Sequence, residues 1–215
     1  MLLSRLQHEL AAVYEAPVSY DVYDFLITDA RLADALAPAA AASNRERLLV
    51  RDDADDCRLS LYIDDEILNH LDRDDPLESL HDGNLAAFLV ALEGVSHFQY
   101  LSWNAMRDHT VTPFELELQA EVDKYVAAAK LIDLQRGAGV PRELHEVLFE
   151  AVSYRPGLSR DLRDLYAEAN RYAAIFCRAL RLRHPCHHGE SGYLNALRRF
   201  YRLSRDGKMR CILAA

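Results

Sequence analysis

The chain has 215 residues, half of them hydrophobic, which is enough for one compact unit with a substantial core. Its net charge of −9 disfavours general attraction to nucleic acids and anionic lipids. No run of about 18 apolar residues occurs, and the N-terminal segment lacks the continuous apolar stretch of a signal peptide. We therefore expect a cytoplasmic protein that does not contact a membrane.

The charge is unevenly distributed along the chain. From Arg178 to the C-terminus, nine Lys or Arg residues stand against Glu190 and Asp206, a net charge of +7, so residues 1–177 carry −16. The simplest interpretation is that the basic end folds against the acidic body or stays solvated. A docking site for an acidic partner or for RNA is the alternative.

The first third of the sequence predicts mixed secondary structure. A helix opens the chain, and residues 19–27 are rich in aromatic and β-branched residues, which indicates a strand. Thr28 and Asp29 can cap a short helix that ends near Pro38, and a linker follows. Residues 46–50 and 57–63 flank an acidic turn, and the second run alternates between apolar and polar residues, which predicts a β-hairpin.

The rest of the sequence predicts helices. Short ones follow Asp64 and Asp75, and the capping box Thr112–Glu115 starts one of the long ones, which Gly137 stops. The longer helices are expected over residues 84–107, 113–136, 141–153, 160–184 and 192–204. The predicted fold class is mainly α (α+β), a multi-helix bundle of about five longer helices behind a small N-terminal section with a strand and a hairpin. The expected parts are residues 1–75 and 76–215, joined as one compact unit.

Three polar residues fall on apolar surfaces of the two central helices. Glu93 and His97 are four residues apart and so share a face of the first helix, while Glu121 lies on the apolar stripe of the second. A short connection makes these helices antiparallel, and counting from the turn at about 1.5 Å per residue places His97 and Glu121 within one helical turn of the same height. We expect the three side chains to meet in the interior.

Burial of carboxylates and an imidazole is costly unless these groups are paired or bind a metal. The simpler hypothesis is a polar network that fixes the helix register, without a cofactor. The alternative is an Fe, Mn or Zn site or an acid/base site, which His145 or Glu168 from later helices would join. Ferritin-like bundles repeat a Glu-x-x-His motif on two helices, whereas the only such motif here is Glu78–His81, so the chain does not resemble them.

A second group has residue types that bind zinc, but it lacks the paired spacing of a zinc finger. It consists of Cys177, His184, Cys186, His187 and His188. We interpret it as a polar loop after a helix end. The four cysteines follow no disulfide pattern, so reduced thiols are expected.

The basic C-terminal helix interleaves arginines with aromatic residues and is amphipathic. Its candidate partner-binding residues are Arg198, Arg199, Tyr201, Arg202 and Arg205. Docking on the chain's own body is the commoner outcome for such a helix. Stacking of RNA bases on Tyr201 is possible in principle, although no RNA-binding signature accompanies it.

The functional prediction depends largely on motifs that the sequence lacks. It contains no phosphate-binding loop, no Gly-x-Gly-x-x-Gly, no His-Glu-x-x-His and no Gly-x-Ser-x-Gly. The sequence therefore favours a non-enzymatic binding or regulatory protein that contacts a protein partner or a second copy of itself. A metal-dependent helical-bundle enzyme is the alternative, and RNA binding through the C-terminal helix is the second alternative.

Overall fold

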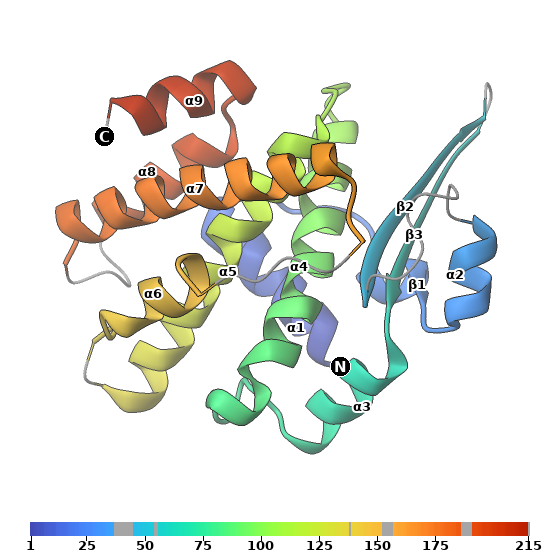
Figure 1. The fold of residues 1–215 in the computed structure, drawn as a ribbon, viewed down its shortest axis with the longest axis horizontal. Helices are drawn as coiled ribbons and strands as arrows, with labels where there is room; N and C mark the ends of the chain where they lie inside the picture. The colour runs from blue at the N-terminus through green and yellow to red at the C-terminus, as the bar shows by residue number, and fades with distance from the viewer. Residues whose placement is uncertain (37–44, 54–55, 138, 152–156, 186–190, 215) are drawn as a thin grey trace.

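The computed structural model describes residues 1–36, 45–53, 56–137, 139–151, 157–185 and 191–214. These residues form a mainly helical fold with a small β-sheet, as the sequence predicts (Figure 1). The helices are α1 (Leu2–Tyr14), α2 (Ala30–Leu36), α3 (Asp65–Arg73), α4 (Asp82–Ala105), α5 (Pro113–Arg136), α6 (Glu143–Phe149), α7 (Arg160–Arg183), α8 (Ser191–Tyr201) and α9 (Arg205–Leu213). None of these helices is both long enough and apolar enough to cross a membrane.

Helices α5 and α7 begin where the sequence predicts. Thr112 Oγ1 accepts the backbone N–H of Glu115, and Glu115 Oε2 accepts the backbone N–H of Thr112, which completes the capping box of α5. Gly137 ends α5 with a φ of 63°, a left-handed conformation that glycine adopts without strain. Ser159 likewise caps α7 through the N–H of Leu162.

The sheet has the strand order β1-β3-β2, where β1 is Leu26–Ile27, β2 is Glu46–Asp53 and β3 is Asp56–Ile63. Strand β1 is parallel to β3, and β2 is antiparallel to it, with Glu46 opposite Ile63 and Leu48 opposite Leu61. One face of the sheet packs on α4, and α2 lies against the other (Figure 1). The alternation of a strand therefore directs Glu46 towards α4, the position from which it reaches the candidate site.

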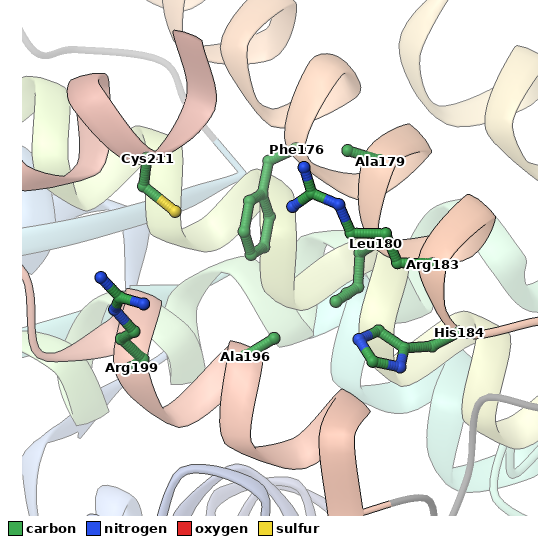
Figure 2. A pocket seen from close by; sticks show the side chains of 8 residues that line it. All are labelled: Phe176, Ala179, Leu180, Arg183, His184, Ala196, Arg199 and Cys211. Carbon is green, nitrogen blue, oxygen red and sulfur yellow. The ribbon is translucent and has the colours of Figure 1, made fainter. Parts of the chain in front are cut away.

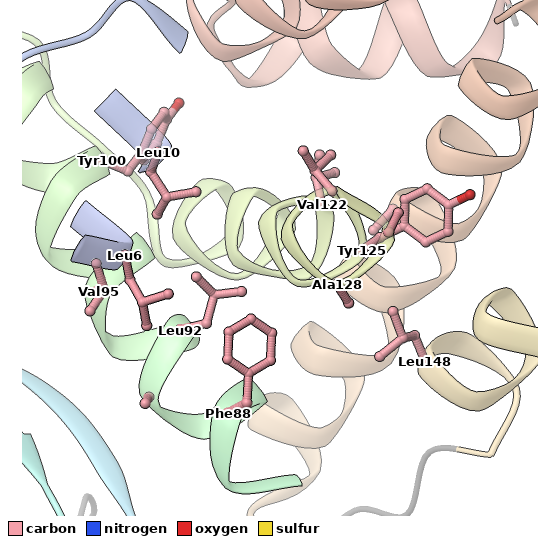
Figure 3. Close-up of a cluster of buried hydrophobic side chains, with 14 of the residues drawn as sticks. Leu6, Leu10, Phe88, Leu92, Val95, Tyr100, Val122, Tyr125, Ala128 and Leu148 are labelled. Atoms are coloured by element: carbon pink, nitrogen blue, oxygen red, sulfur yellow. The ribbon is translucent and has the colours of Figure 1, made fainter. Parts of the chain in front are cut away.

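The hydrophobic core is continuous from α1 to α9. In Figure 3, Leu6 and Leu10 of α1 and Leu92 of α4 lie on one side of α5, and Leu148 of α6 lies on the other, so the core surrounds this helix. Helix α7 crosses α5, and α8 packs on α1 (Figure 1). Helix α5 is thus enclosed on nearly all sides, which explains why it carries buried polar residues as well as apolar ones.

Several element boundaries differ from the predictions because side chains cap backbone groups locally. Residues 22–25 form a 3-10 turn (η1, Val22–Phe25), since Asp21 accepts the N–H of Tyr23, and only Leu26–Ile27 are a strand. Asp75 starts a turn and no helix, because the N–H of Leu80 donates to Gln135 instead of continuing a helix. Ser204 caps α9, a separate helix that the sequence analysis did not identify.

Candidate metal centre

The candidate site lies between α4 and α5, which pack as antiparallel neighbours. Glu93 and His97 are one turn apart on α4, and Glu117 faces them from α5. One ligand atom from each of these three residues lies within 4.8 Å of the other two. A metal ion at about 2.0–2.2 Å from each donor requires donor separations below about 4.4 Å, so a closure of about half an ångström would suffice.

His97 is buried, with 5% of its surface exposed, and its two ring nitrogens have different surroundings. Nδ1 lies 3.3 Å from Oε1 of Glu46. An ionised Glu46 can only accept a hydrogen bond, so Nδ1 then carries the proton. Nε2 has no hydrogen-bond partner among the described residues, and the Glu117 Oε1 atom beside it is 3.7 Å away. A carboxylate that holds one nitrogen of a histidine while the other faces acidic ligands is the usual arrangement around a protein-bound metal.

Gly94 allows Glu46 to approach His97. A Cβ atom at position 94 would lie 2.9 Å from Cγ of Glu46 and 3.0 Å from Cδ1 of Leu61, both in the sheet. These distances are shorter than carbon atoms tolerate in contact. The glycine thus lets β2 pack directly on α4, and the carboxylate of Glu46 reaches the histidine ring one turn away.

Lys124 is the cation of the site. Its Nζ donates to Oε2 of Glu93 at 3.0 Å and to Oε1 of Glu121 at 2.6 Å, and only 13% of its side chain is exposed. The side chains of Glu93 and Glu117 are 28% and 17% exposed, so solvent reaches the site from this side. We name Glu46, Glu93, His97, Glu117, Glu121 and Lys124 the Glu-His cluster.

The Glu-His cluster contains more negative than positive groups. Four carboxylates face one ammonium group and one imidazole. Burial would lower the pKa of His97, but Glu117, Glu46 and Glu93 outweigh that effect and raise it to about 10. Burial raises the pKa of Glu117 to about 7, although His97 opposes the rise. The cluster therefore takes up protons readily, and a divalent cation would neutralise the same excess of negative charge.

The Asp123 cluster, defined as Tyr14, Ser96, Gln119, Asp123 and Lys208, lies on another side of α5. Asp123 is 1% exposed and accepts hydrogen bonds from the hydroxyls of Tyr14 and Ser96 and from Nε2 of Gln119. Lys208 of α9 is fully buried and donates to Oε1 of Gln119 at 2.6 Å. Its Nζ lies 4.5 Å from the centre of the Tyr100 ring, a cation–π distance. Asp123 and its neighbour Lys124 are both largely buried, because helices enclose α5.

The structure brings Glu93 and His97 together as expected but places Glu121 one turn away from the three-residue site. Glu117 occupies the position expected for Glu121, which instead pairs with Lys124. The prediction for Glu121 applied the helical rise of about 1.5 Å per residue to the connection between α4 and α5 as well. Residues 109–112 are not helical, and Thr112 is extended, so each of them advances the chain further than a helical residue does.

The other candidate ligands lie elsewhere. Nε2 of His145 is 3.0 Å from the carbonyl oxygen of Ala174, between α6 and α7, and its ring packs against Phe149. Glu168 was expected to point inward but is exposed, because the buried face of α7 runs through Ala169, Ala173 and other residues on a different side of that helix.

The zinc-type group is described only in part. Cys177 is fully buried in the core, where burial raises the pKa of its thiol. His184 ends α7, and its ring meets the ring of Tyr193 edge to face. Cys186, His187 and His188 lie outside the described residues.

The basic helix α8 docks on the body of the protein itself. Arg198 donates to the carbonyl oxygen of Val13 and pairs with Glu15, and Arg202 donates to the carbonyl oxygen of Glu15. Tyr201, a candidate for base stacking, is 1% exposed and stacks on Tyr14, so its ring is not accessible to a base in this structure.

Two further arginines of this region remain at the surface. Arg199 is exposed, and the exposed Arg205 lies over the ring of Phe114.

Comparisons of the chain with models of protein families, with characterised proteins and with solved structures found no match.

Proposed function

We propose that the protein binds one divalent transition-metal ion through Glu93, His97 and Glu117, and that this ion is the centre of a metal-dependent reaction. The observation that carries the proposal is the convergence of three donor atoms within 4.8 Å around the buried Nε2 of His97, which has no hydrogen-bond partner among the described residues. A nitrogen donor with two carboxylates suits Mn²⁺, Fe²⁺ or Zn²⁺.

The coordination number favours chemistry over a purely structural role. Structural zinc sites use four protein ligands, whereas catalytic sites use three and leave a position for water or substrate. The partial exposure of Glu93 and Glu117 gives such a position access to solvent. An ion held there would act as a Lewis acid and would lower the pKa of a bound water.

The residues around the three ligands have distinct supporting roles in this proposal. Glu46 orients the ring of His97 through Nδ1. Lys124 outweighs the effect of burial and lowers the pKa of Glu93, which keeps this ligand ionised. Because Lys124 contacts Oε2 of Glu93, the other carboxylate oxygen stays available to the ion.

Titration of metal-stripped protein with Mn²⁺, followed by calorimetry and by the electron spin resonance signal of free Mn²⁺, tests this proposal. Mn²⁺ prefers oxygen ligands, so it favours the carboxylates of the Glu-His cluster over the thiol of Cys186. We expect one ion per chain. We also expect release of protons, measured in buffers of different ionisation enthalpy, because the ion displaces them from His97 and Glu117.

His97→Ala and Glu117→Gln should each abolish Mn²⁺ binding, whereas Glu121→Gln is the matched control and should retain it. Glu121 lies on the next turn of the same helix and contacts Lys124 without belonging to the three-residue site. Unchanged stoichiometry in His97→Ala, or the absence of binding by the unmodified protein, would refute the proposal. In that case bound protons alone neutralise the excess negative charge of the Glu-His cluster, and the role of the cluster is to fix the helix register.

Partner binding through α8 stays a prediction, and so does RNA binding. The contacts of Arg198 and Arg202 with α1 weaken both, since these side chains are engaged within the protein. The same contacts support the simpler interpretation of the basic segment, which is docking on the acidic body.

A further inference from the structure

A groove with a volume of about 360 Å³ runs between α1 and α5. Side chains from residues 5–13 of α1 line one side, and side chains from residues 126–134 of α5 line the other. The helices are antiparallel here, since contacts between them join later residues of α5 to earlier residues of α1. At about 1.5 Å per helical residue, each side of the groove is about 12 Å long. The volume lies in the range of about 300–1,000 Å³ that is typical of ligand-binding cavities.

The lining of the groove is mainly apolar, although the groove opens to solvent. Leu6, Leu10 and Val126 form its buried floor, and Figure 3 shows the first two beside α5. Nearer the surface, Leu131 is half-buried and Leu134 is 66% exposed. Solvent in the groove thus contacts apolar surface, and a ligand that displaced this solvent would be stabilised by the hydrophobic effect.

The Lys and Arg side chains at the rim of the groove are already paired within the protein. Nζ of Lys130 on α5 donates to Oε2 of Glu9 on α1, so this ion pair bridges the two sides. Arg5 pairs with Asp75 at 3.0 Å. The rim therefore favours a neutral ligand over an anion. His8, which also lines the groove, can exchange a hydrogen bond with a hydroxyl group.

The dimensions of the groove favour a thin ligand. A volume of about 360 Å³ over a length of about 12 Å gives a mean cross-section of about 30 Å². An α-helix with its side chains is about 10 Å across, so its cross-section is much larger. The groove therefore suits a single alkyl chain better than a helix of a partner protein.

A second cavity, of about 150 Å³, lies between α7, α8 and α9 (Figure 2). Phe176, Leu180 and Ala196 line it, while Arg183 and His184 at its edge already interact with other groups of the protein. Its volume is below the range that is typical of ligand-binding cavities. The groove between α1 and α5 is thus the better candidate.

We propose that the groove between α1 and α5 binds a neutral amphiphile with one straight alkyl chain, such as a medium-chain aliphatic alcohol. The chain lies along the apolar floor, and the hydroxyl group stays at the rim, where His8 can bond it. An extended chain with C–C bonds of about 1.5 Å advances about 1.3 Å per carbon, so about 12 Å accommodates about nine carbons. This site is separate from the metal proposal and stands without it.

Methyl NMR spectroscopy of the full chain, titrated with straight-chain primary alcohols, tests the proposal. Binding should shift the methyl signals of Leu6, Leu10 and Val126 and leave those of Ile67 and Ile212 unchanged, because the latter two lie outside the groove. Burial of one methylene group corresponds to about fourfold in affinity, so each added carbon should tighten binding by about that factor. The gain should stop at about nine carbons, where the chain fills the groove.

Ala127→Leu fills the groove from the α5 side and should abolish the binding of 1-nonanol. Ala127 is only half-buried, so the fold should accept the larger side chain. Ala86→Leu, at an exposed position of α4 outside the groove, is the matched control and should leave binding unchanged.

Glu9→Gln tests the charge balance at the rim. The unmodified protein should bind nonanoate more weakly than 1-nonanol, because Lys130 is already paired with Glu9. Glu9→Gln frees the ammonium group of Lys130 and should tighten the binding of nonanoate about tenfold. The affinity for 1-nonanol should stay almost unchanged in this variant.

Four results would overturn the proposal. The first is the absence of shifts at Leu6, Leu10 and Val126 with any of the alcohols. The second is an affinity that does not depend on chain length, since the apolar floor would then contribute nothing. The third is tighter binding of nonanoate than of 1-nonanol by the unmodified protein, because the ligand would then be an anion. The fourth is unchanged binding in Ala127→Leu, which would place the site elsewhere.

Discussion

The Glu-His cluster and the Asp123 cluster both include residues of α4 and α5, yet they differ in how completely their polar atoms are satisfied. Each carboxylate oxygen of Asp123 accepts a hydrogen bond from a fixed neighbour. In the Glu-His cluster, Nε2 of His97 accepts and donates nothing among the described residues, and carboxylates outnumber cations.

This difference separates a structural polar network from a candidate site. A fully bonded network specifies how α1, α4, α5 and α9 fit together, because any other register would leave buried groups unpaired. A cluster with an unpartnered nitrogen and surplus negative charge bears a cost that a bound cation would remove.

The two clusters also respond to pH in opposite directions. The pKa of His97 is raised to about 10, so the folded state retains a proton that the unfolded state loses above pH 6.5, and stability falls as the pH rises. Burial lowers the pKa of Lys208 to about 7 against the attraction of Asp123 and Glu115. The folded state thus lacks a proton that the unfolded state holds up to pH 10.5, and stability rises with pH.

The largest effect is expected from Asp123→Ala. This change leaves Tyr14, Ser96 and Gln119 without their buried acceptor and removes the carboxylate that most favours the charged form of Lys208. We expect a loss of about 3–5 kcal/mol in the free energy of unfolding, measured with urea. Asp164→Asn, on the exposed side of α7, is the control and should change stability by less than about 0.5 kcal/mol. A loss below about 1 kcal/mol in Asp123→Ala would mean that the network is not structural.

The next effect concerns Lys208→Met and is a change in pH dependence. Between about pH 7.5 and 9.5, the stability of the unmodified protein should rise by about 2 kcal/mol relative to this variant. Urea unfolding at several pH values measures the difference. Arg205→Met, on the same helix, should show no such trend because its guanidinium stays charged throughout. Parallel pH profiles of the Lys208→Met variant and the unmodified protein would contradict the inferred burial of the amine.

Gly94→Ala tests the contact between the sheet and the Glu-His cluster. Alanine normally stabilises a helix interior by about 1 kcal/mol over glycine. Here we expect a loss of about 1–2 kcal/mol, because the methyl group collides with Glu46 and Leu61. The loss should shrink in a Glu46→Ala background, where one of the two clashes is gone. A stabilised Gly94→Ala protein would show that the sheet does not press on α4 at this point.

The smallest effect is expected from His97→Gln in metal-free protein. Relative to this variant, the free energy of unfolding of the unmodified protein should fall by about 1 kcal/mol between about pH 7 and 9, because folded His97 holds its proton. The fall is small because His97, Glu117 and Glu46 titrate as a coupled group and share this proton. Saturating Mn²⁺ should flatten this trend, because the ion replaces the proton. If saturating Mn²⁺ leaves this pH dependence of stability unchanged, His97 titrates without taking part in metal binding, which would contradict the proposal.

Much of the fold was predictable because local rules govern it. The capping box at Thr112, the glycine at position 137 and the alternation of residues 57–63 act over a few residues. The spacing of Glu93 and His97 likewise needs only the geometry of one helix.

The rest of the candidate site depends on contacts between distant segments. Glu46 reaches His97 across 51 residues, and no local pattern signals that approach. Glu117 replaces Glu121 because of the extended connection before Pro113, which a count of residues cannot reveal. No local pattern signals the burial of Asp123, since the helices that enclose α5 come from remote parts of the chain.

The docking of α8 on α1 has a consequence for biosynthesis. Arg202 hydrogen-bonds to Glu15 across 187 residues, and Tyr14 stacks on Tyr201 over a similar separation. At a translation rate of about 5–20 residues per second, the part of α1 that packs on α8 is made on the order of ten seconds or more before α8. The nascent protein thus exposes a hydrophobic surface for that interval, during which a chaperone that shields α1 would improve the yield of folded protein.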